Sequence, residues 1–218
     1  MIPLSDASRR PTNFPIVTLS IIIINFAVFI AELINGDAFV EKWALVPAHV
    51  AAGRDLVTVF TSMFMHASWG HIIGNMVFLW AFGPEIEDAM GPRRYGIFYL
   101  LGGVAAAAAQ VGFAPHSTLP NLGASGAIAA VMGSFLVTFP RDQIRTILVL
   151  VVFITITYVP AIILIGFWFV LQIWSAGQIA PQGSTEVAYL AHIGGFMFGA
   201  IFARLFESGR ASAKNGFD

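Results

Sequence analysis

Residues 123–130 read Gly123-Ala124-Ser125-Gly126-Ala127-Ile128-Ala129-Ala130, and a long apolar run follows them through Phe139. This stretch places a serine hydroxyl at the start of a segment that is apolar enough for a membrane helix. Glycine residues on both sides of the serine let other backbone approach its hydroxyl closely. Whether Ser125 does chemistry therefore depends on whether the rest of the chain supplies a partner that can take its proton.

The composition indicates a membrane protein. Of the 218 residues, 57% are hydrophobic and 11% are charged, whereas a soluble domain carries about 25% charged residues. The mean hydropathy of +0.80 agrees with lipid as the solvent for most of the chain, and the length fits one polytopic domain in a lipid bilayer. The net charge of −1 says nothing about partners, and the sequence has no basic patch that would argue for nucleic acid. The absence of cysteine excludes disulfides, thiolate metal sites and a cysteine nucleophile.

The apolar segments predict an all-α polytopic membrane protein with six transmembrane helices. They divide the chain into a cytoplasmic N-terminal tail (1–15), a six-helix domain (16–206) and a cytoplasmic C-terminal tail (207–218). The predicted helices are residues 16–34, 71–90, 95–113, 125–139, 160–177 and 187–206.

Two segments between these helices are apolar but do not fit a transmembrane helix. Residues 146–159 are rich in β-branched side chains, yet the segment is only fourteen residues long before Pro160. Since a spanning helix needs about 20 residues, we expect an interfacial or re-entrant segment there. Residues 35–70 form a long first loop, which we expect to lie partly in the membrane interface with Trp43 and Trp69 at headgroup level.

The charges agree with six spans and with both termini in the cytoplasm, because Lys and Arg favour the cytoplasmic side of a membrane protein. On this topology nine of the eleven Lys and Arg residues lie inside, and only Lys42 and Arg54 lie outside. The inside residues are Arg9, Arg10, Arg93, Arg94, Arg141, Arg145, Arg204, Arg210 and Lys214. A seventh span at 146–159 would move the last three of these outside, so six spans is the better count.

Four polar side chains from three of these helices meet at one depth, in the outer half of the membrane. Ser125 opens the fourth helix, His192 lies near the start of the sixth, and His71 and Asn75 open the second. The spacing of His71 and Asn75 places both on one face of a helix. Because polar groups are costly inside a bilayer, ionisable ones there indicate a functional site.

These side chains are the ones that acyl transfer requires. A serine hydroxyl becomes a nucleophile when a base takes its proton, and a neutral imidazole can do so. An asparagine amide, a histidine N–H and the backbone N–H of the serine can stabilise a developing oxyanion. No carboxylate suits the role of a third triad member, because Asp142 and Glu186 lie at opposite ends of the spans. The sequence therefore predicts a dyad of Ser125 and His192.

The glycine spacing favours a close approach of the serine and histidine helices. Gly195 and Gly199 are four residues apart, and Gly126 and Ala130 have the same interval. Small residues at this spacing allow tight contact between membrane helices, although many membrane helices have the pattern. If these two faces meet, the backbones come close enough for the histidine to reach the serine.

Four short motifs contain the site residues and further glycine, histidine and glutamate residues. They are His66-x4-His71-x3-Asn75, Gly83-x3-Glu87-x3-Gly91, Gly123-x-Ser125-Gly126 and Ala191-His192-x2-Gly195-x3-Gly199. In this order they resemble the rhomboid family of intramembrane serine proteases. The resemblance covers about residues 40–206, and the combination is specific whereas any single piece is not.

The resemblance implies a role for each residue of the site. Ser125 would be the nucleophile and His192 the general base. His71, Asn75 and the Ser125 backbone N–H would form the oxyanion hole, and Gly123 would shape the turn before the serine. Six membrane helices are also what the minimal form of the family has.

The resemblance further implies an endopeptidase that cuts single-span membrane proteins in the outer half of the membrane, without a metal or a cofactor. Such substrates must unwind locally because a helix hides its carbonyls. A compact chain of this kind is typical of a bacterial inner membrane. Glu87 would make a structural contact near the inner end of the second helix. One departure concerns the first loop, where the family often has a Trp-Arg pair and this chain has Val57 and Thr58.

Other side chains receive structural interpretations. Glu32 interrupts the first helix and is expected at the membrane interface, and His66 is expected to order the first loop. Four aromatic residues of 160–177 are expected to face lipid as anchors, namely Phe167, Trp168, Phe169 and Trp174.

The residues alone leave four other functional interpretations open. An inactive rhomboid-like protein that binds membrane helices without cutting them would not need an intact serine and histidine. A small transporter could use the polar cluster as a midplane site, although we find none of the internal repeats that transporters commonly show. A metal site of His66, His71 and His192 lacks a carboxylate. The acidic residues within 85–88 are explained more simply by a polar helix end than by a proton relay.

Overall fold

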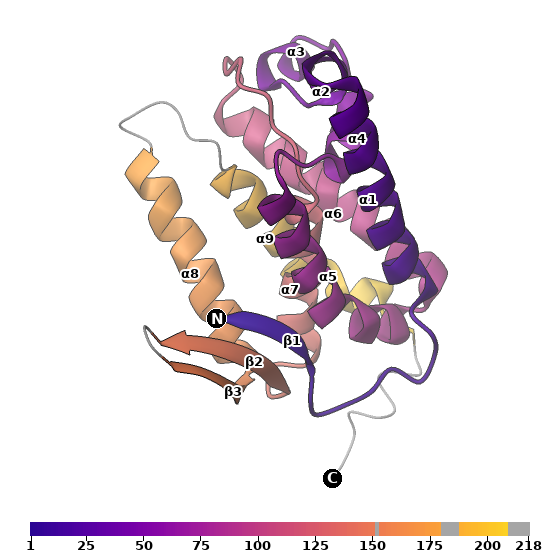
Figure 1. Ribbon diagram of the computed structural model, residues 1–218, viewed down its shortest axis with the longest axis vertical. Helices are drawn as coiled ribbons and strands as arrows, with labels where there is room; N and C mark the ends of the chain where they lie inside the picture. The colour runs from indigo at the N-terminus through magenta and orange to yellow at the C-terminus, as the bar shows by residue number, and fades with distance from the viewer. Residues whose placement is uncertain (151–152, 180–187, 209–218) are drawn as a thin grey trace.

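A computed structural model describes residues 1–150, 153–179 and 188–208, which form a bundle of long helices with a small sheet at one end (Figure 1). Short elements fill the first loop: α2 (Asp37–Trp43), α3 (Pro47–Ala51), α4 (Thr58–Thr61) and a 3-10 helix, η1 (Ser62–Phe64). A long helix lies on each predicted range: α1 (Ile16–Asn35), α5 (Trp69–Met90), α6 (Pro92–Phe113), α7 (Ser125–Thr138), α8 (Ala161–Ile179) and α9 (Tyr189–Phe206).

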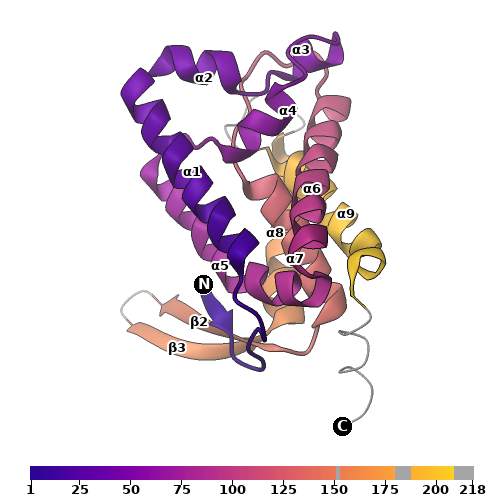
Figure 2. The same ribbon diagram turned by 90° about the vertical axis from the view of Figure 1, so that its right-hand side faces the viewer.

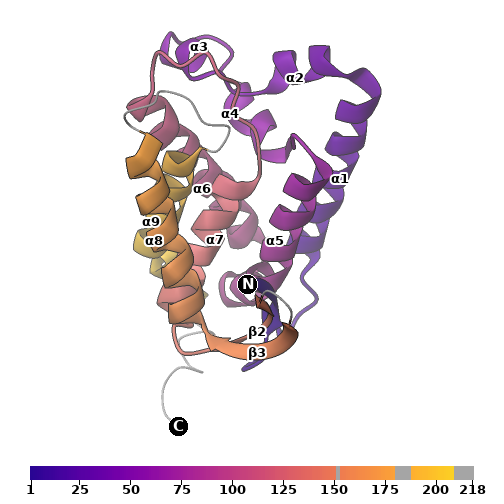
Figure 3. The ribbon, with the colours of Figure 1, turned by 60° about the vertical axis from the view of Figure 1, so that its left-hand side comes forward.

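Helix α7 forms the centre of the bundle because its side chains are apolar and mostly small. It packs against α5, α6, α8 and α9, and every residue from Gly126 to Phe135 is buried. Figure 3 shows α7 between α5 on one side and α8 with α9 on the other. Its 14 residues extend about 21 Å, which is less than the thickness of a hydrocarbon core of about 30 Å.

Helices α7 and α9 touch through their backbones. A Cβ built on Gly195 would overlap the carbonyl oxygen of Gly126, and one built on Gly199 would overlap the carbonyl oxygen of Ala130. Only glycine leaves room for so close an approach. The prediction that these two small-residue faces meet is confirmed.

The two ends of the bundle differ in structure. Figure 2 shows α2, α3 and α4 at one end, which we call the loop end, and the strands at the other, which we call the sheet end. The strands β1 (Ile2–Asp6), β2 (Gln143–Leu150) and β3 (Phe153–Pro160) form an antiparallel sheet in the order β1-β2-β3. The chain returns to the sheet end after α9, where the backbone N–H of Ser208 donates to the carbonyl of Ala89.

The sheet corrects the prediction of an all-α fold. Residues 146–159 were predicted as an interfacial or re-entrant segment, but 146–150 and 153–159 lie in two paired strands whose register runs from Gln143↔Pro160 to Leu150↔Phe153. Their β-branched side chains favour strands because such side chains pack well on a pleated surface. Each strand has eight residues. A segment of this length is too short for a spanning helix but long enough for a strand.

The N-terminal segment is also part of the folded domain, whereas residues 1–15 were predicted to be a tail. Strand β1 extends the sheet, with Ile2 opposite Ile147. The Arg9 guanidinium then forms an ion pair with Asp142, just before β2. Of the predicted C-terminal tail, residues 209–218 lie outside the described residues, as do residues 180–187 before α9.

Two carboxylates hold parts of the bundle together. The Glu87 carboxylate accepts hydrogen bonds from the backbone N–H groups of Val17 and Thr18 and from the Thr18 hydroxyl, each at 2.8 Å. It thereby satisfies N–H groups that the first turn of α1 leaves free, which is the structural contact expected of it. Glu32 is buried within the protein and accepts from the backbone N–H of His66, while its place at the membrane interface stays a prediction.

Apolar helices make the chain an integral membrane protein. Within the described ranges, α1, α6 and α9 are long and apolar enough to cross a membrane, while α7 and α8 are shorter apolar helices. Helix α5 has the length but carries Glu85, Glu87 and Asp88 near its end. The count of six transmembrane spans therefore stays a prediction.

Candidate active site

Ser125 and His192 lie side by side although they are 67 positions apart in the sequence. Ser125 is the first residue of α7, and His192 lies at the start of α9. The His192 Nε2 atom is 2.7 Å from the Ser125 Oγ atom, which is hydrogen-bond distance. The backbone contact between Gly195 and Gly126 sets this distance, because each glycine lies within one turn of the site residue on its own helix. An imidazole placed in this way can take the proton of a hydroxyl.

A third side chain completes a chain of hydrogen bonds at His192. The Oε1 atom of Gln172, on α8, lies 2.7 Å from the His192 Nδ1 atom. Sequence analysis missed Gln172 because it searched only for a carboxylate beside the histidine. The available signal was an amide side chain directly after the apolar run of residues 161–171.

Two aromatic rings of α8 pack against α9, one of them beside the same histidine. The Trp168 and His192 ring centroids are 5.9 Å apart, and Phe169 stacks on Phe196 of α9 with centroids 4.0 Å apart. The prediction that the aromatic residues of this helix face outward was therefore wrong for Trp168 and Phe169. It holds for Phe167 and Trp174, which are exposed, because α8 places alternate parts of the aromatic run on opposite faces.

Gly123 and His71 lie on the other side of the serine. Gly123 has φ +138°, a backbone conformation that favours glycine, and a Cβ built there would lie 3.0 Å from the His71 ring and 3.6 Å from the Ser125 Oγ atom. Its N–H donates to the carbonyl of Ser62 at 2.8 Å, which ties the turn before α7 to the first loop. The structure therefore brings His71 and Ser125 together across a glycine that has no side chain to separate them.

Asn75 belongs to a second group of contacts beside His71. Its Nδ2 atom lies 2.9 Å from the His66 Nε2 atom, and the His66 and His71 rings meet edge to face at 5.0 Å. The His66 backbone N–H in turn donates to Glu32. His66 thus orders the end of the first loop, as expected, and its ring holds Asn75 next to His71.

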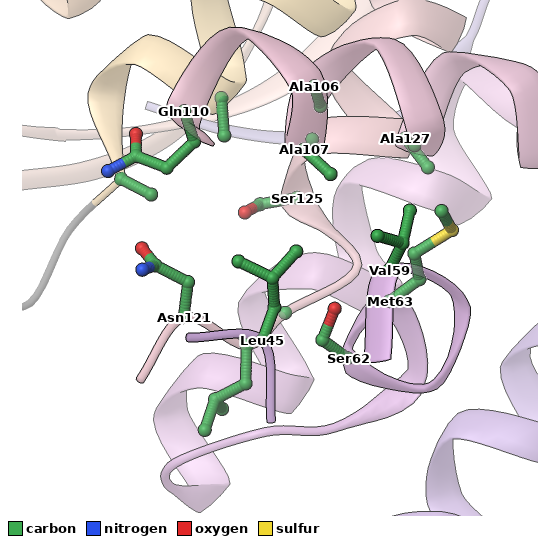
Figure 4. Close-up of a pocket in the computed structure, with 16 residues that line it drawn as sticks. Leu45, Val59, Ser62, Met63, Ala106, Ala107, Gln110, Asn121, Ser125 and Ala127 are labelled. Carbon is green, nitrogen blue, oxygen red and sulfur yellow. The ribbon is translucent and has the colours of Figure 1, made fainter. Parts of the chain in front are cut away.

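A cavity opens beside the serine on the side of the first loop. Its volume is about 60 Å³, while one water needs roughly 10–15 Å³ by the same measure, so the cavity has room for a few waters. Figure 4 shows the Ser125 hydroxyl pointing toward the amides of Gln110 and Asn121, with Val59 and Met63 on the opposite side. The Gln110 Oε1 atom is buried and has no hydrogen-bond partner within the described chain.

Among the described residues, no group of three or more His, Asp or Glu side chains lies close enough to hold a metal ion. The histidines near Ser125 instead contact one another, Asn75 and Gln172. The polar groups of the site are therefore arranged as hydrogen-bond donors and acceptors.

Comparison with known proteins places these residues in a family. A family model described as "Rhomboid domain" matches residues 53–208, which is more than half of the chain. The chain belongs to the rhomboid family. The rhomboid domain includes Ser125, His192, His71, Asn75 and Gly123, so the resemblance inferred from the four motifs is confirmed at the level of the family.

Three named rhomboid relatives align with the chain. The mitochondrial rhomboid protein 1 of Saccharomyces cerevisiae is 29% identical over 209 residues, which cover 92% of this chain and 55% of the yeast protein. The mitochondrial RHOMBOID-like protein 12 of Arabidopsis thaliana is 29% identical over 211 residues, or 89% of this chain and 59% of the plant protein. The rhomboid protease GlpG of Yersinia pestis is 28% identical over 130 residues, or 60% of this chain and 46% of GlpG.

The chain thus spans about half the length of these rhomboid relatives. Two of the three are named as mitochondrial and one is bacterial. The relatives therefore do not support the prediction of a bacterial inner membrane over another membrane.

The first rhomboid loop is anchored by residues other than a Trp-Arg pair. Val57 is exposed, but the Thr58 hydroxyl donates to the carbonyl of Asp55 at 2.7 Å. The Thr61 hydroxyl donates to the carbonyl of Trp43, also at 2.7 Å. These bonds fix the short helices of the loop end above the serine without the arginine that is frequent in the family.

Proposed function

We propose that this chain is a serine endopeptidase that cleaves transmembrane segments of other membrane proteins within the bilayer. The observation that carries the proposal is the 2.7 Å contact between His192 Nε2 and Ser125 Oγ, made by two polar residues on neighbouring apolar helices. Packing alone does not explain this contact. An apolar pair would pack the two helices better, because polar groups are costly in a membrane. Membership of the rhomboid family supports the same reaction class.

In the proposed reaction, Ser125 Oγ attacks the substrate carbonyl while His192 Nε2 takes the hydroxyl proton. The imidazolium then gives this proton to the leaving amine, and a water attacks the acyl-enzyme with His192 again as the base. The cavity beside Ser125 can hold that water, since it is polar on the side of Gln110 and Asn121.

The oxyanion would be stabilised by N–H groups on the side of Ser125 away from His192. The first N–H groups of a helix have no partner within that helix, so the backbone of Ser125 at the start of α7 is one candidate donor. His71 is a second, because only Gly123 separates its ring from the serine. Asn75 is a third, since its contact with His66 uses part of the amide and holds the rest beside His71.

The proposed orientation has six spans with the sheet end in the cytoplasm. Arg9, Arg94 and Arg204 all make polar contacts at that end, to Asp142, Glu207 and the carbonyl of Val137. Lys and Arg favour the cytoplasmic side. Substrate segments would then be cut nearer the opposite surface, where Ser125 lies close to the first loop. Segments with glycine or proline there would be preferred, because their helices unwind more readily.

Covalent labelling with a fluorophosphonate tests the proposal directly. Wild-type protein in detergent should be labelled, while Ser125→Ala should lose the acceptor hydroxyl and His192→Ala the base, so both should stay unlabelled. A folded wild-type protein that the probe reaches but does not label would contradict the proposal. It would favour a rhomboid-like protein that binds membrane helices without cutting them.

Identification of the bond cleaved would then test the substrate class. A single-span protein with a glycine-containing segment should be cut by wild type in liposomes and left intact by Ser125→Ala. Mass spectrometry of the products should place the cut in the half of the segment that faces the loop end. A cut in an extramembrane loop would contradict intramembrane cleavage but not the serine mechanism.

A further inference from the structure

His192 has two ring nitrogens, and each one meets a different side chain. Nε2 faces the Ser125 Oγ atom and Nδ1 faces the Gln172 Oε1 atom, both at 2.7 Å. Gln172 is only 9% exposed and lies on α8, in an otherwise apolar stretch of that helix. Burying an amide in a membrane helix costs free energy unless its polar atoms are hydrogen-bonded. A buried amide at this place therefore indicates a functional role.

The neighbours of Gln172 decide which way its amide points. Its Nε2 atom faces the backbone carbonyl of Trp168 at 3.4 Å, and that oxygen can only accept a hydrogen bond. The reverse orientation would set the amide oxygen against the carbonyl oxygen, with no proton between them. The side-chain oxygen of Gln172 therefore faces His192.

The orientation of the amide in turn decides the protonation of the histidine ring. An amide oxygen has no proton to donate, so the His192 Nδ1 atom must carry the proton in this contact. In the neutral ring the Nε2 atom is then unprotonated, and its lone pair is directed at the Ser125 hydroxyl. The opposite tautomer would present an N–H to the serine and could not take its proton.

We propose that Gln172 is a positioning residue, which holds the His192 ring in the tautomer and orientation that the base requires. The proposal rests on the proposed function of His192 and adds a third side chain to the dyad. When the ring becomes an imidazolium, the bond from Nδ1–H to Gln172 becomes charge-assisted and therefore stronger. Because Gln172 lies on α8 and His192 on α9, the base is ready only while these two helices stay packed together.

A spectroscopic experiment reads the tautomer without any turnover. Nitrogen-15 NMR of histidine-labelled protein, with His192→Ala used to assign the signal, should show a protonated Nδ1 and an unprotonated Nε2 for His192 in wild type. Gln172→Met keeps the shape of the side chain but removes the acceptor, and it should shift the ring toward the other tautomer or toward a mixture. A wild-type ring with its proton on Nε2 would overturn the proposal.

A kinetic experiment tests the consequence for the serine. Labelling by a fluorophosphonate at several concentrations separates the maximal rate, kinact, from the binding constant, KI. Gln172→Met should lower kinact by roughly 10–100-fold, by analogy with the loss of the outer partner of a metal-binding histidine, and should leave KI nearly unchanged. Gln172→Glu keeps an acceptor at the same reach and should retain most of kinact.

Two controls keep the outcomes separable. Ile173→Met changes the neighbouring side chain, which is half-exposed on the outside of α8, and should label like wild type. Thermal unfolding of each variant should stay near that of wild type, and equal kinact in wild type and a folded Gln172→Met protein would overturn the proposal. If wild type is never labelled, the proposed protease function fails, but the NMR result still decides whether Gln172 sets the tautomer of His192.

Discussion

Helix α9 makes two kinds of contact on its two sides. Toward α7 its backbone touches backbone, because Gly195 and Gly199 leave no side chain between the helices. Toward α8 its contacts run through side chains, with Phe196 stacked on Phe169 and His192 bonded to Gln172. On the α7 side of α9 no side chain can change its rotamer to accommodate a substitution. On the α8 side the side chains can re-pack.

The difference assigns separate tasks to the two sides. A backbone contact sets the distance between α7 and α9, and with it the distance from His192 to Ser125. Side-chain contacts with α8 set how the His192 ring is turned and protonated. Substitutions on the α7 side should therefore change the Ser125–His192 distance and lower the reaction rate strongly. Substitutions on the α8 side should lower the rate by smaller amounts.

The largest effect is expected from a methyl group in the backbone contact. Gly195→Ala would force α9 away from the Gly126 carbonyl, and a displacement of about 1 Å between reacting groups costs about 100-fold in rate. Fluorophosphonate labelling should therefore slow by at least about 100-fold. Thermal unfolding, measured in parallel, should show lower stability.

Gly166→Ala is the matched control for that substitution. It adds the same methyl group to a membrane helix, but at a place on α8 where, apart from the nearby backbone of that helix, no described atom lies within 4 Å of the added carbon. It should label and unfold like wild type. Wild-type labelling by Gly195→Ala would show that the backbone contact does not set the Ser125–His192 distance.

A smaller effect is expected on the α8 side. Phe169→Leu removes the ring that stacks on Phe196, and an aromatic pair contributes about 0.5–1.5 kcal/mol. Stability should fall by about 1 kcal/mol and labelling by only a few-fold, since a leucine of similar volume can re-pack. Phe167→Leu, on the exposed face of α8, should change neither quantity. A loss as large as that of Gly195→Ala would mean that the two sides of α9 do not differ.

The smallest effect on the site is expected from the titration of a carboxyl group at the sheet end. This end lies away from both sides of α9. Burial, and then the neighbouring Asp142, raise the pKa of Asp6 from 3.8 to about 7, although Arg9 opposes the shift and Glu85 also faces this cluster. The folded state thus keeps a proton that the unfolded chain releases above about pH 4. Docking of β1 should be most stable below that pH and should weaken as the pH rises through about 7.

Thermal unfolding between pH 4 and pH 8 would measure this dependence. Asp6→Asn carries no titrating carboxyl and should flatten the curve over that interval. An unchanged slope in Asp6→Asn would assign the proton to another group of the cluster. The Ser125–His192 contact contains no residue of β1, so the variant should keep the labelling rate of wild type at pH 7.

Much of the site could be predicted from residue types and spacing. A serine between glycines, a histidine before Gly195 and Gly199, and two polar residues one turn apart are unusual in apolar helices, and each of them lies at the site. Gln172 could not be predicted in the same way. A single amide in an apolar helix has many uses, and its contact with His192 depends on how α8 is turned against α9.

In the fold, too, local features could be predicted from the sequence, whereas the pairing of strands could not. The apolar segments were found at their correct positions because membrane helices need long runs of apolar residues. The pairing of residues 143–150 with 153–160 and with 2–6 was missed. A short β-branched segment next to a membrane can be an interfacial segment or a strand. The choice depends on its partner strands, which here are residues 153–160 and the distant residues 2–6.

The amino-acid sequence by itself therefore determined the membrane setting, the places of the long helices, the family and most of the residues that we propose for the chemistry. These follow from local composition and spacing, because lipid as a solvent restricts which residues a spanning helix can contain. Only the tertiary structure decided the sheet, the inward face of α8 and the bond between Gln172 and His192. Each of these depends on the rotation and register of elements far apart in the chain, which packing sets and spacing within one segment does not.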